Sequence, residues 1–327
     1  MLAYFIRRIG YGLLTIFAVS ILAFLIIQLP PGDYVTSYIA ALESQGDEVS
    51  AEEAQALREY FGLGQPAYVQ YLKWISQIVR GNFGISFQYR VPVTDVIGER
   101  LMLTIVLALS TLVFVWVVAI PIGIYSAVRQ YSFLDYVATT FGFTGLAIPD
   151  FLFALVLMYL AWDWFDFSIG GLFSPEYASA PWSTARVVDL LKHLVIPIVV
   201  LGTSGTASLI RITRANLLDE LRKPYVVTAR AKGMSEWQLI FKYPVRLAFN
   251  PIISITAYIL PFLVSGSIIV SVVLNLPTVG PVLLRSLLSQ DMYLAGAIIL
   301  LIGVMTVIGT LISDILLGIV DPRVRLR

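Results

Sequence analysis

The stretch Ala215–Phe249, ANLLDELRKPYVVTARAKGMSEWQLIFKYPVRLAF, is a long polar interruption in the second half of an otherwise apolar chain. Its centre is predicted to form two short helices joined by a tight turn. Gly233 can end the first helix, because glycine adopts the left-handed conformation without a Cβ penalty. Ser235 can cap a second helix, which Pro244 then ends or kinks. The stretch therefore predicts a basic, surface-exposed helix pair between two apolar segments.

The composition of the whole chain is typical of a polytopic membrane protein. Of its 327 residues 58% are hydrophobic and 13% are charged, and the mean hydropathy is +0.84. The chain has no cysteine and one histidine, which excludes disulfides, thiolate chemistry and multi-histidine metal sites. It also has no Gly-Lys pair and so lacks the phosphate-binding loop GxxxxGK[ST]. Energy for transport against a gradient would have to come from a partner or from ions.

Six apolar runs are each long enough to cross a hydrocarbon core about 30 Å thick. They cover roughly 9–29, 101–128, 134–162, 190–210, 250–274 and 293–319. In the polar segment between the first two runs, a capping-box pattern at Ser50–Glu53 and a proline at Pro66 each predict the start of an amphipathic helix. We therefore expect an all-α protein in three parts. They are an N-terminal segment with an uncleaved first span (1–29), a helical outer insertion (30–99) and a core with spans 2 to 6 (100–327).

Basic residues are unevenly distributed between the two sides that these spans define. Fourteen of the 22 Lys and Arg residues fall on the side of the two termini, the 129–135 turn and the 211–246 loop. The positive-inside rule places this side in the cytoplasm. Both termini are therefore expected in the cytoplasm, and the insertion is expected on the outer, periplasmic side of a bacterial or archaeal inner (plasma) membrane.

Short motifs spread over the whole chain carry a family resemblance. They are Tyr4-x-x-Arg-Arg8, Pro31-Gly-Asp33, the segment Leu63–Trp74, Gly81-x-Phe-Gly-x-Ser-Phe87, Pro121-x-Gly123, Ile148-Pro149, Thr228–Gly233 and Asp321-Pro-Arg323. In order and spacing they resemble the B-type permease subunits of the dipeptide/oligopeptide/nickel family of ABC importers. The resemblance implies the six-span type I importer permease fold, with spans 2 to 5 lining the path in a heterodimer with a second homologous permease.

The resemblance also implies that the 215–249 loop is the cytoplasmic "EAA" loop, which docks on an ATPase subunit and passes nucleotide-driven motion to the membrane. Arg230 and Lys232 can pair there with acidic groups at the rim of the ATPase groove, and Val227 stands where the family's glutamate would be. Without the Thr228–Gly233 pattern, the favoured interpretation would be a plain cytoplasmic loop that obeys the positive-inside bias. The residues expected to couple to the ATPase are Tyr225, Thr228, Ala229, Arg230, Ala231, Lys232, Gly233, Met234, Ser235 and Glu236.

An acidic residue lies inside the third apolar run. Asp150 follows Ile148-Pro149, where the proline frees a backbone carbonyl and bends the span. An ionisable side chain at membrane depth is costly unless it is paired or hydrated. Asp150 is therefore a candidate either for contact with a cationic part of the solute or for structural pairing. The residues expected to line the translocation path are Pro149, Asp150, Gly202, Ser265 and Gly266.

The function that these observations favour is that of the permease subunit of an ATP-driven, binding-protein-dependent importer without a catalytic or metal site of its own. Peptides are the expected solute, because the long outer insertion suits a binding protein with a bulky solute; oligosaccharides and nickel chelates are the alternatives. An alternative function from a different class is that of a proton-coupled secondary transporter that uses Asp150. An aspartic protease pair of Asp150 and Asp314 lacks the expected glycine-flanked motif.

The same hypothesis defines the expected partners. They are a second homologous permease subunit, two ABC ATPase subunits, a periplasmic or lipid-anchored solute-binding protein and membrane lipid, with no nucleic acid. ATP and Mg²⁺ would be bound by the ATPase subunits, and no cofactor is expected in this chain.

Overall fold

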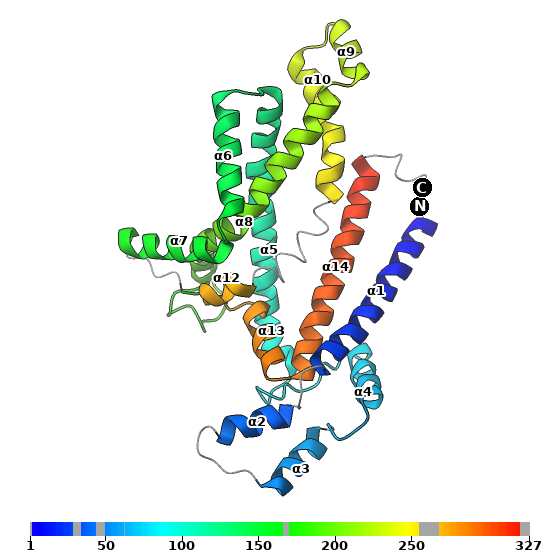
Figure 1. Cartoon of the computed structure of the whole chain (residues 1–327), viewed down its shortest axis with the longest axis vertical. Helices are drawn as coiled ribbons and strands as arrows, with labels where there is room; N and C mark the ends of the chain where they lie inside the picture. Colours follow the sequence, from blue (N-terminus) through cyan, green and yellow to red (C-terminus); the bar gives the residue numbers. More distant parts are fainter. Residues whose placement is uncertain are drawn as a thin grey trace. The chain divides into compact units, whose positions relative to one another are not determined.

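The computed structural model describes residues 2–28, 34–43, 50–61, 63–165, 170–254 and 268–320. These residues form helices and connecting turns, which confirms the predicted all-α fold (Figure 1). The labelled helices are α1 (Leu2–Gln28), α2 (Tyr34–Glu43), α3 (Ala51–Phe61), α4 (Ala67–Val79), α5 (Val93–Val128), α6 (Phe133–Ala147), α7 (Asp150–Phe165), α8 (Thr184–Leu221), α9 (Pro224–Ala231), α10 (Glu236–Lys242), α12 (Ile268–Val273), α13 (Val279–Leu288) and α14 (Met292–Val320).

Within the described residues, four helices are long and apolar enough to cross a membrane: α1, α5, α8 and α14. The pair α6 and α7 forms a fifth candidate span, broken by a bend of 104°. The chain is therefore a multi-pass membrane protein. Most of the predicted fifth run, 250–274, lies outside the described residues, and the count of six spans stays a prediction.

The third apolar run, 134–162, is two helices rather than one. Ser132 caps α6 by accepting a hydrogen bond from the backbone N–H of Asp135 (3.3 Å). Ile148 then leaves the helix with φ −86° and ψ 123°. An extended backbone is what the ring of a following proline imposes on its neighbour. The predicted bend at Pro149 is confirmed, and it is sharp enough to start a new helix at Asp150.

The contacts between residues group the chain into two compact units. Met1–Tyr4, Ile105–Pro277 and Ile308–Arg327 form the first, and Phe5–Thr104 and Thr278–Val307 form the second. In the first unit, α8 packs along α6 and α7. Glycines of α5 and α6 allow close packing on α8: a Cβ at Gly123 of α5 would lie 2.7 Å from Thr213, and one at Gly145 of α6 would lie 2.8 Å from Thr203.

The insertion contains α2, α3 and α4, of which the sequence predicted the last two. The capping box at the start of α3 is formed in both directions. The backbone N–H of Ser50 donates to Glu53 Oε2 (3.1 Å), and the N–H of Glu53 donates to Ser50 Oγ (3.2 Å). Pro66 precedes the first residue of α4, as predicted, and Gly81 follows this helix with a φ of +79°.

In the second unit, a buried carboxylate joins the turn after α4 to the start of α14. Asp291 is fully buried and directly precedes α14. Its Oδ2 accepts hydrogen bonds from the Ser86 hydroxyl (2.5 Å) and the Gln88 N–H (3.0 Å). Its Oδ1 accepts from the N–H of Leu294 (3.2 Å), in the first turn of the helix. This carboxylate therefore caps α14 and fixes the turn at the same time.

The same turn packs closely on α14. Gly84 has a φ of +78°, and a Cβ at this position would lie 2.5 Å from the Tyr293 ring. Phe87 contacts the same ring edge to face, with 5.2 Å between centroids. One turn further along α14, a Cβ at Gly296 would lie 2.5 Å from the Trp74 ring. Packing on α14 thus explains Gly84 and Phe87 of the Gly81–Phe87 motif, and the positive φ of Gly81 explains that glycine.

We expect Asp291→Ala to lower the free energy of unfolding by about 3 kcal/mol, because three donors, two of them buried, would lose their acceptor. Unfolding of the purified protein in detergent micelles measures this change. Asp95→Ala is the control, since Asp95 is exposed in the first turn of α5 and its removal should lower stability by less than about 1 kcal/mol. Equal losses in the two variants would contradict a special role for the buried carboxylate.

Candidate functional site

The polar loop of the first unit folds as the predicted helix pair, α9 and α10, beyond the end of α8 (Figure 1). Pro224 is the first residue of α9, where a missing N–H costs nothing. The turn between the helices contains Gly233, whose φ is +78°. Ser235 takes the N-cap position of α10, although its hydroxyl makes no capping hydrogen bond. The predicted helix–turn–helix is therefore confirmed, with boundaries that differ by one or two residues.

A small apolar core anchors the helix pair. Val226 of α9 and Leu239 of α10 are both fully buried. They pack with Leu217 near the end of α8 and with Ala127 at the end of α5. The buried members of this cluster are Ala127, Leu217, Val226, Leu239, Ile240, Val245 and Ala248. The pair is thus attached to the ends of two long helices by side-chain packing as well as by the chain itself.

Tyr225 strengthens this attachment. Its hydroxyl donates a hydrogen bond to Glu220 Oε2 near the end of α8 (2.7 Å), and its ring meets that of Tyr243 at 6.4 Å between centroids. Burial, together with the hydrogen bond to Glu220 and its negative charge, raises the pKa of the Tyr225 hydroxyl above its ordinary value. The phenol therefore stays protonated and remains a donor at physiological pH.

An ion pair connects the two short helices across the turn. Arg230 Nε and Nη2 donate to the two carboxylate oxygens of Glu236, at 2.5 and 3.0 Å. The hydrogen bond from Arg230 holds the pKa of Glu236 below its usual range, and the same contact raises the pKa of Arg230. The structure thus brings two of the predicted coupling residues together within the loop. The predicted pairing of Arg230 with a partner stays a prediction.

The other predicted coupling residues divide into an inner and an outer set. Tyr225, Ala229 and Met234 pack against the apolar core of the loop. The exposed ones are Thr228, Arg230, Ala231, Lys232, Gly233, Ser235 and Glu236.

Two exposed aromatic residues of α10 were missed by the sequence analysis. Trp237 is 67% exposed and Phe241 is 53% exposed, and their rings stack with 5.8 Å between centroids. Their spacing of four residues, opposite the buried Leu239 and Ile240, is the helical signal that could have revealed them. Exposed aromatic side chains of this kind are frequent anchors of protein interfaces.

The predicted path residues that the structure describes are Pro149, Asp150 and Gly202. Asp150 begins α7, is half-buried, and its carboxylate accepts a hydrogen bond from the Ser204 hydroxyl of α8. Pro149 lies in the break before it. Gly202 faces Phe114 of α5, where a Cβ would lie 2.6 Å from the ring, so its described contact is a helix seam. Ser265 and Gly266 lie outside the described residues.

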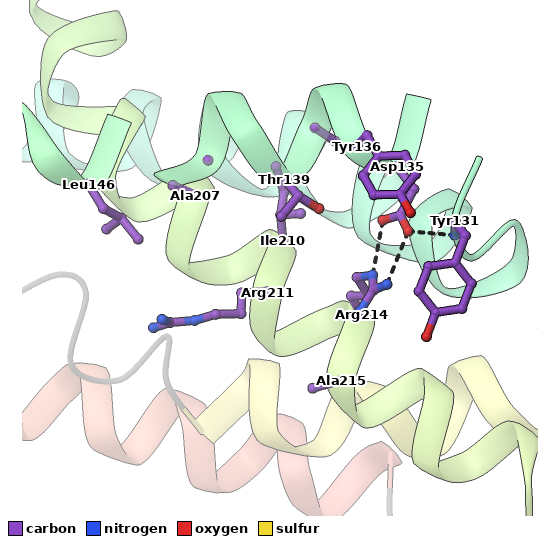
Figure 2. A pocket seen from close by; sticks show the side chains of 12 residues that line it. Tyr131, Asp135, Tyr136, Thr139, Leu146, Ala207, Ile210, Arg211, Arg214 and Ala215 are labelled. Carbon is purple, nitrogen blue, oxygen red and sulfur yellow. Dashed lines mark hydrogen bonds and ion pairs between the residues drawn. The ribbon is translucent and has the colours of Figure 1, made fainter. Parts of the chain in front are cut away.

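A pocket of about 260 Å³ lies between α6 and α8 (Figure 2). At one end Arg214 Nε and Nη2 donate to the two oxygens of Asp135, both at 3.0 Å. Neither this pocket nor this ion pair was predicted from the sequence. The described residues contain no group of three or more His, Asp or Glu side chains that could hold a metal ion.

Comparison with known proteins identifies the class to which this architecture belongs. Residues 119–326 match the family described as "Binding-protein-dependent transport system inner membrane component", and residues 1–108 match "Binding-prot-dependent transport system membrane comp, N-term". The chain therefore belongs to the family of inner membrane components of binding-protein-dependent transport systems. The predicted family resemblance is confirmed, and the chain is a transport subunit of the inner membrane.

Two relatives illustrate the similarity over the full length. The chain is 37% identical over 326 residues to the oligopeptide transport system permease protein AppB of Bacillus subtilis (strain 168), with 99% of each chain covered. It is 32% identical over 325 residues to the glutathione transport system permease protein GsiC of Escherichia coli (strain K12), again with 99% of each covered.

We expect Gly233→Ala to destabilise the α9–α10 turn by about 1 kcal/mol, because a side chain disfavours the left-handed conformation. A Cβ at this position meets nothing within 4 Å, so the loss is conformational rather than steric. Hydrogen exchange of the turn amides measures it. Gly98→Ala is the control, since Gly98 lies in α5 with open space around it and alanine favours the helix there. Equal protection of the turn amides in both variants would contradict the claim that the left-handed conformation at position 233 favours glycine.

Proposed function

We propose that this chain is the permease subunit of an ATP-driven importer for peptides. The observation that carries the proposal is similarity over the full length to permeases named for oligopeptides and for glutathione, a tripeptide. These names favour peptides over oligosaccharides or nickel chelates. The chain would form a heterodimer with a second homologous permease and receive its solute from a periplasmic or lipid-anchored binding protein. Both termini and the α9–α10 loop would lie in the cytoplasm.

The helix pair α9 and α10 would be the contact with an ATPase subunit. Its exposed side chains, among them Thr228, Lys232 and Trp237, offer small, basic and aromatic groups to a groove. The buried core behind them connects this surface to the ends of α5 and α8. Motion of an ATPase that binds and hydrolyses ATP with Mg²⁺ would therefore move the membrane helices, and alternating access would follow from repeated cycles.

Two mutations of the exposed surface test this contact. Trp237→Ala and Lys232→Glu should each weaken binding of the ATPase subunits by about tenfold, since an aromatic anchor or a paired charge contributes 1 kcal/mol or more. Pull-down of the ATPases by tagged permease in mild detergent measures binding. Tyr68→Ala is the control, because Tyr68 is also exposed, at 69%, but lies in the insertion. Unchanged binding in both loop variants would remove α9–α10 as the docking site.

The Arg230–Glu236 pair allows a charge-swap test of how the loop works. Arg230→Glu should stop peptide uptake into proteoliposomes of the whole complex while ATP hydrolysis continues, because two carboxylates would repel across the turn. The double variant Arg230→Glu/Glu236→Arg restores the pair and should recover most of the uptake. Failure of a correctly inserted double variant would show that Arg230 acts through direct contact with the partner.

Uptake into the same proteoliposomes also distinguishes the ATP-driven importer from a proton-coupled transporter that uses Asp150. Uptake should require ATP and the ATPase subunits, and it should persist when a protonophore collapses the proton gradient. Uptake by this chain without ATPases, abolished in Asp150→Asn, would instead support the secondary transporter.

A further inference from the structure

The pocket between α6 and α8 has apolar walls and a polar end (Figure 2). Gly142 and Leu146 of α6 face Ala207 and Ile210 of α8 across it. A Cβ at Gly142 would lie 3.9 Å from Ala207, which is van der Waals distance, so α6 and α8 come close together at these two small residues. Such a lining suits a hydrocarbon chain rather than a polar solute.

Two arginines of α8 line this pocket, and only one of them forms an ion pair within the described part of the chain. Arg214 is neutralised by Asp135, which also accepts the N–H of Tyr131 (2.9 Å). Arg211 is exposed and makes no hydrogen bond or ion pair with another residue in the described part of the chain. Figure 2 shows its side chain extending along α8, away from the Asp135–Arg214 pair. One positive charge at the pocket is therefore left for an external anion.

Arg211 also marks the end of the apolar part of α8. Residues 194–210 carry no charge, and Arg211 is the first charged residue after them. The end of an uncharged run of this length is where the headgroups of a bilayer begin. Tyr131 and Tyr136, which line the same pocket, are 69% and 60% exposed, as is typical of tyrosines at the interface. The excess of Lys and Arg on this side favours the cytoplasmic leaflet, which carries anionic lipids.

We propose that this pocket binds one anionic phospholipid of the cytoplasmic leaflet. Its phosphate would lie on Arg211, and part of one acyl chain would lie in the pocket against Leu146 and Ile210, beside Gly142 and Ala207. The proposal depends on charge complementarity and on the apolar walls, and it requires that the chain spans a membrane with this pocket on the cytoplasmic side. It is therefore independent of the proposed peptide importer, and either can fail without the other.

Native mass spectrometry of the purified full-length protein tests the site. The protein is released from micelles that contain equimolar phosphatidylglycerol and phosphatidylcholine with identical acyl chains. The wild type should retain phosphatidylglycerol preferentially. Arg211→Gln should reduce this retention about fivefold, the effect of one basic side chain worth about 1 kcal/mol, without changing retention of phosphatidylcholine. Arg211→Lys should keep most of the preference.

Arg222→Gln is the matched control, because Arg222 is an exposed arginine that follows α8 outside the pocket. It should retain phosphatidylglycerol as the wild type does. Gly142→Leu tests the apolar part separately, since it fills the pocket with all charges intact, and it should also lose the retained lipid. This variant keeps the test open if Arg211→Gln does not fold.

Two results would overturn the proposal. One is equal retention of phosphatidylglycerol by the wild type, Arg211→Gln and Gly142→Leu. The other is displacement of the lipid from the wild type by a peptide with a free terminal carboxylate but not by its amidated form. That outcome would assign Arg211 to the solute instead.

Discussion

Hydrocarbon offers no hydrogen-bond partner to the peptide backbone, and this constraint determines where the chain can depart from a helix. Two of the described turns are accordingly stabilised by hydrogen bonds to carboxylates. Asp291 accepts a hydrogen bond from Ser86 in the turn after α4, and Asp135 accepts one from the N–H of Tyr131 between α5 and α6. At Pro149, where the ring forbids the helix, the chain starts a new helix immediately with Asp150. The carboxylates of Asp135, Asp150 and Asp291 thus all lie at helix N-termini.

Helix α8 is longer than the hydrocarbon core of a membrane is thick, and it connects the membrane to the α9–α10 loop. Its 38 residues span about 57 Å at 1.5 Å per residue, which exceeds a hydrocarbon core of about 30 Å. The helix therefore continues past the bilayer and carries α9 and α10 on its end. Because these short helices share a buried core with α5 as well, a displacement of the loop acts on two long helices at once.

Local signals in the sequence were sufficient for much of this structure. Gly233, Pro66 and the Ser50–Glu53 capping box each act within a few residues, so their effect on the chain follows from covalent geometry and nearby hydrogen bonds. The Asp135–Arg214 pair joins residues 79 apart, and nothing near either residue indicates the other. Gly202 shows the same limit, because a small residue suits a solute path or a helix seam, and only its neighbour Phe114 distinguishes the two.

The contact between Ser86 and Asp291 bears on how the protein is made. These residues are 205 positions apart, and Asp291 directly precedes the last long helix. During synthesis, the turn after α4 therefore cannot form its hydrogen bonds to Asp291 until nearly the whole chain has left the ribosome. A chain truncated before Asp291 would leave the Ser86 hydroxyl and the Gln88 N–H permanently without this acceptor.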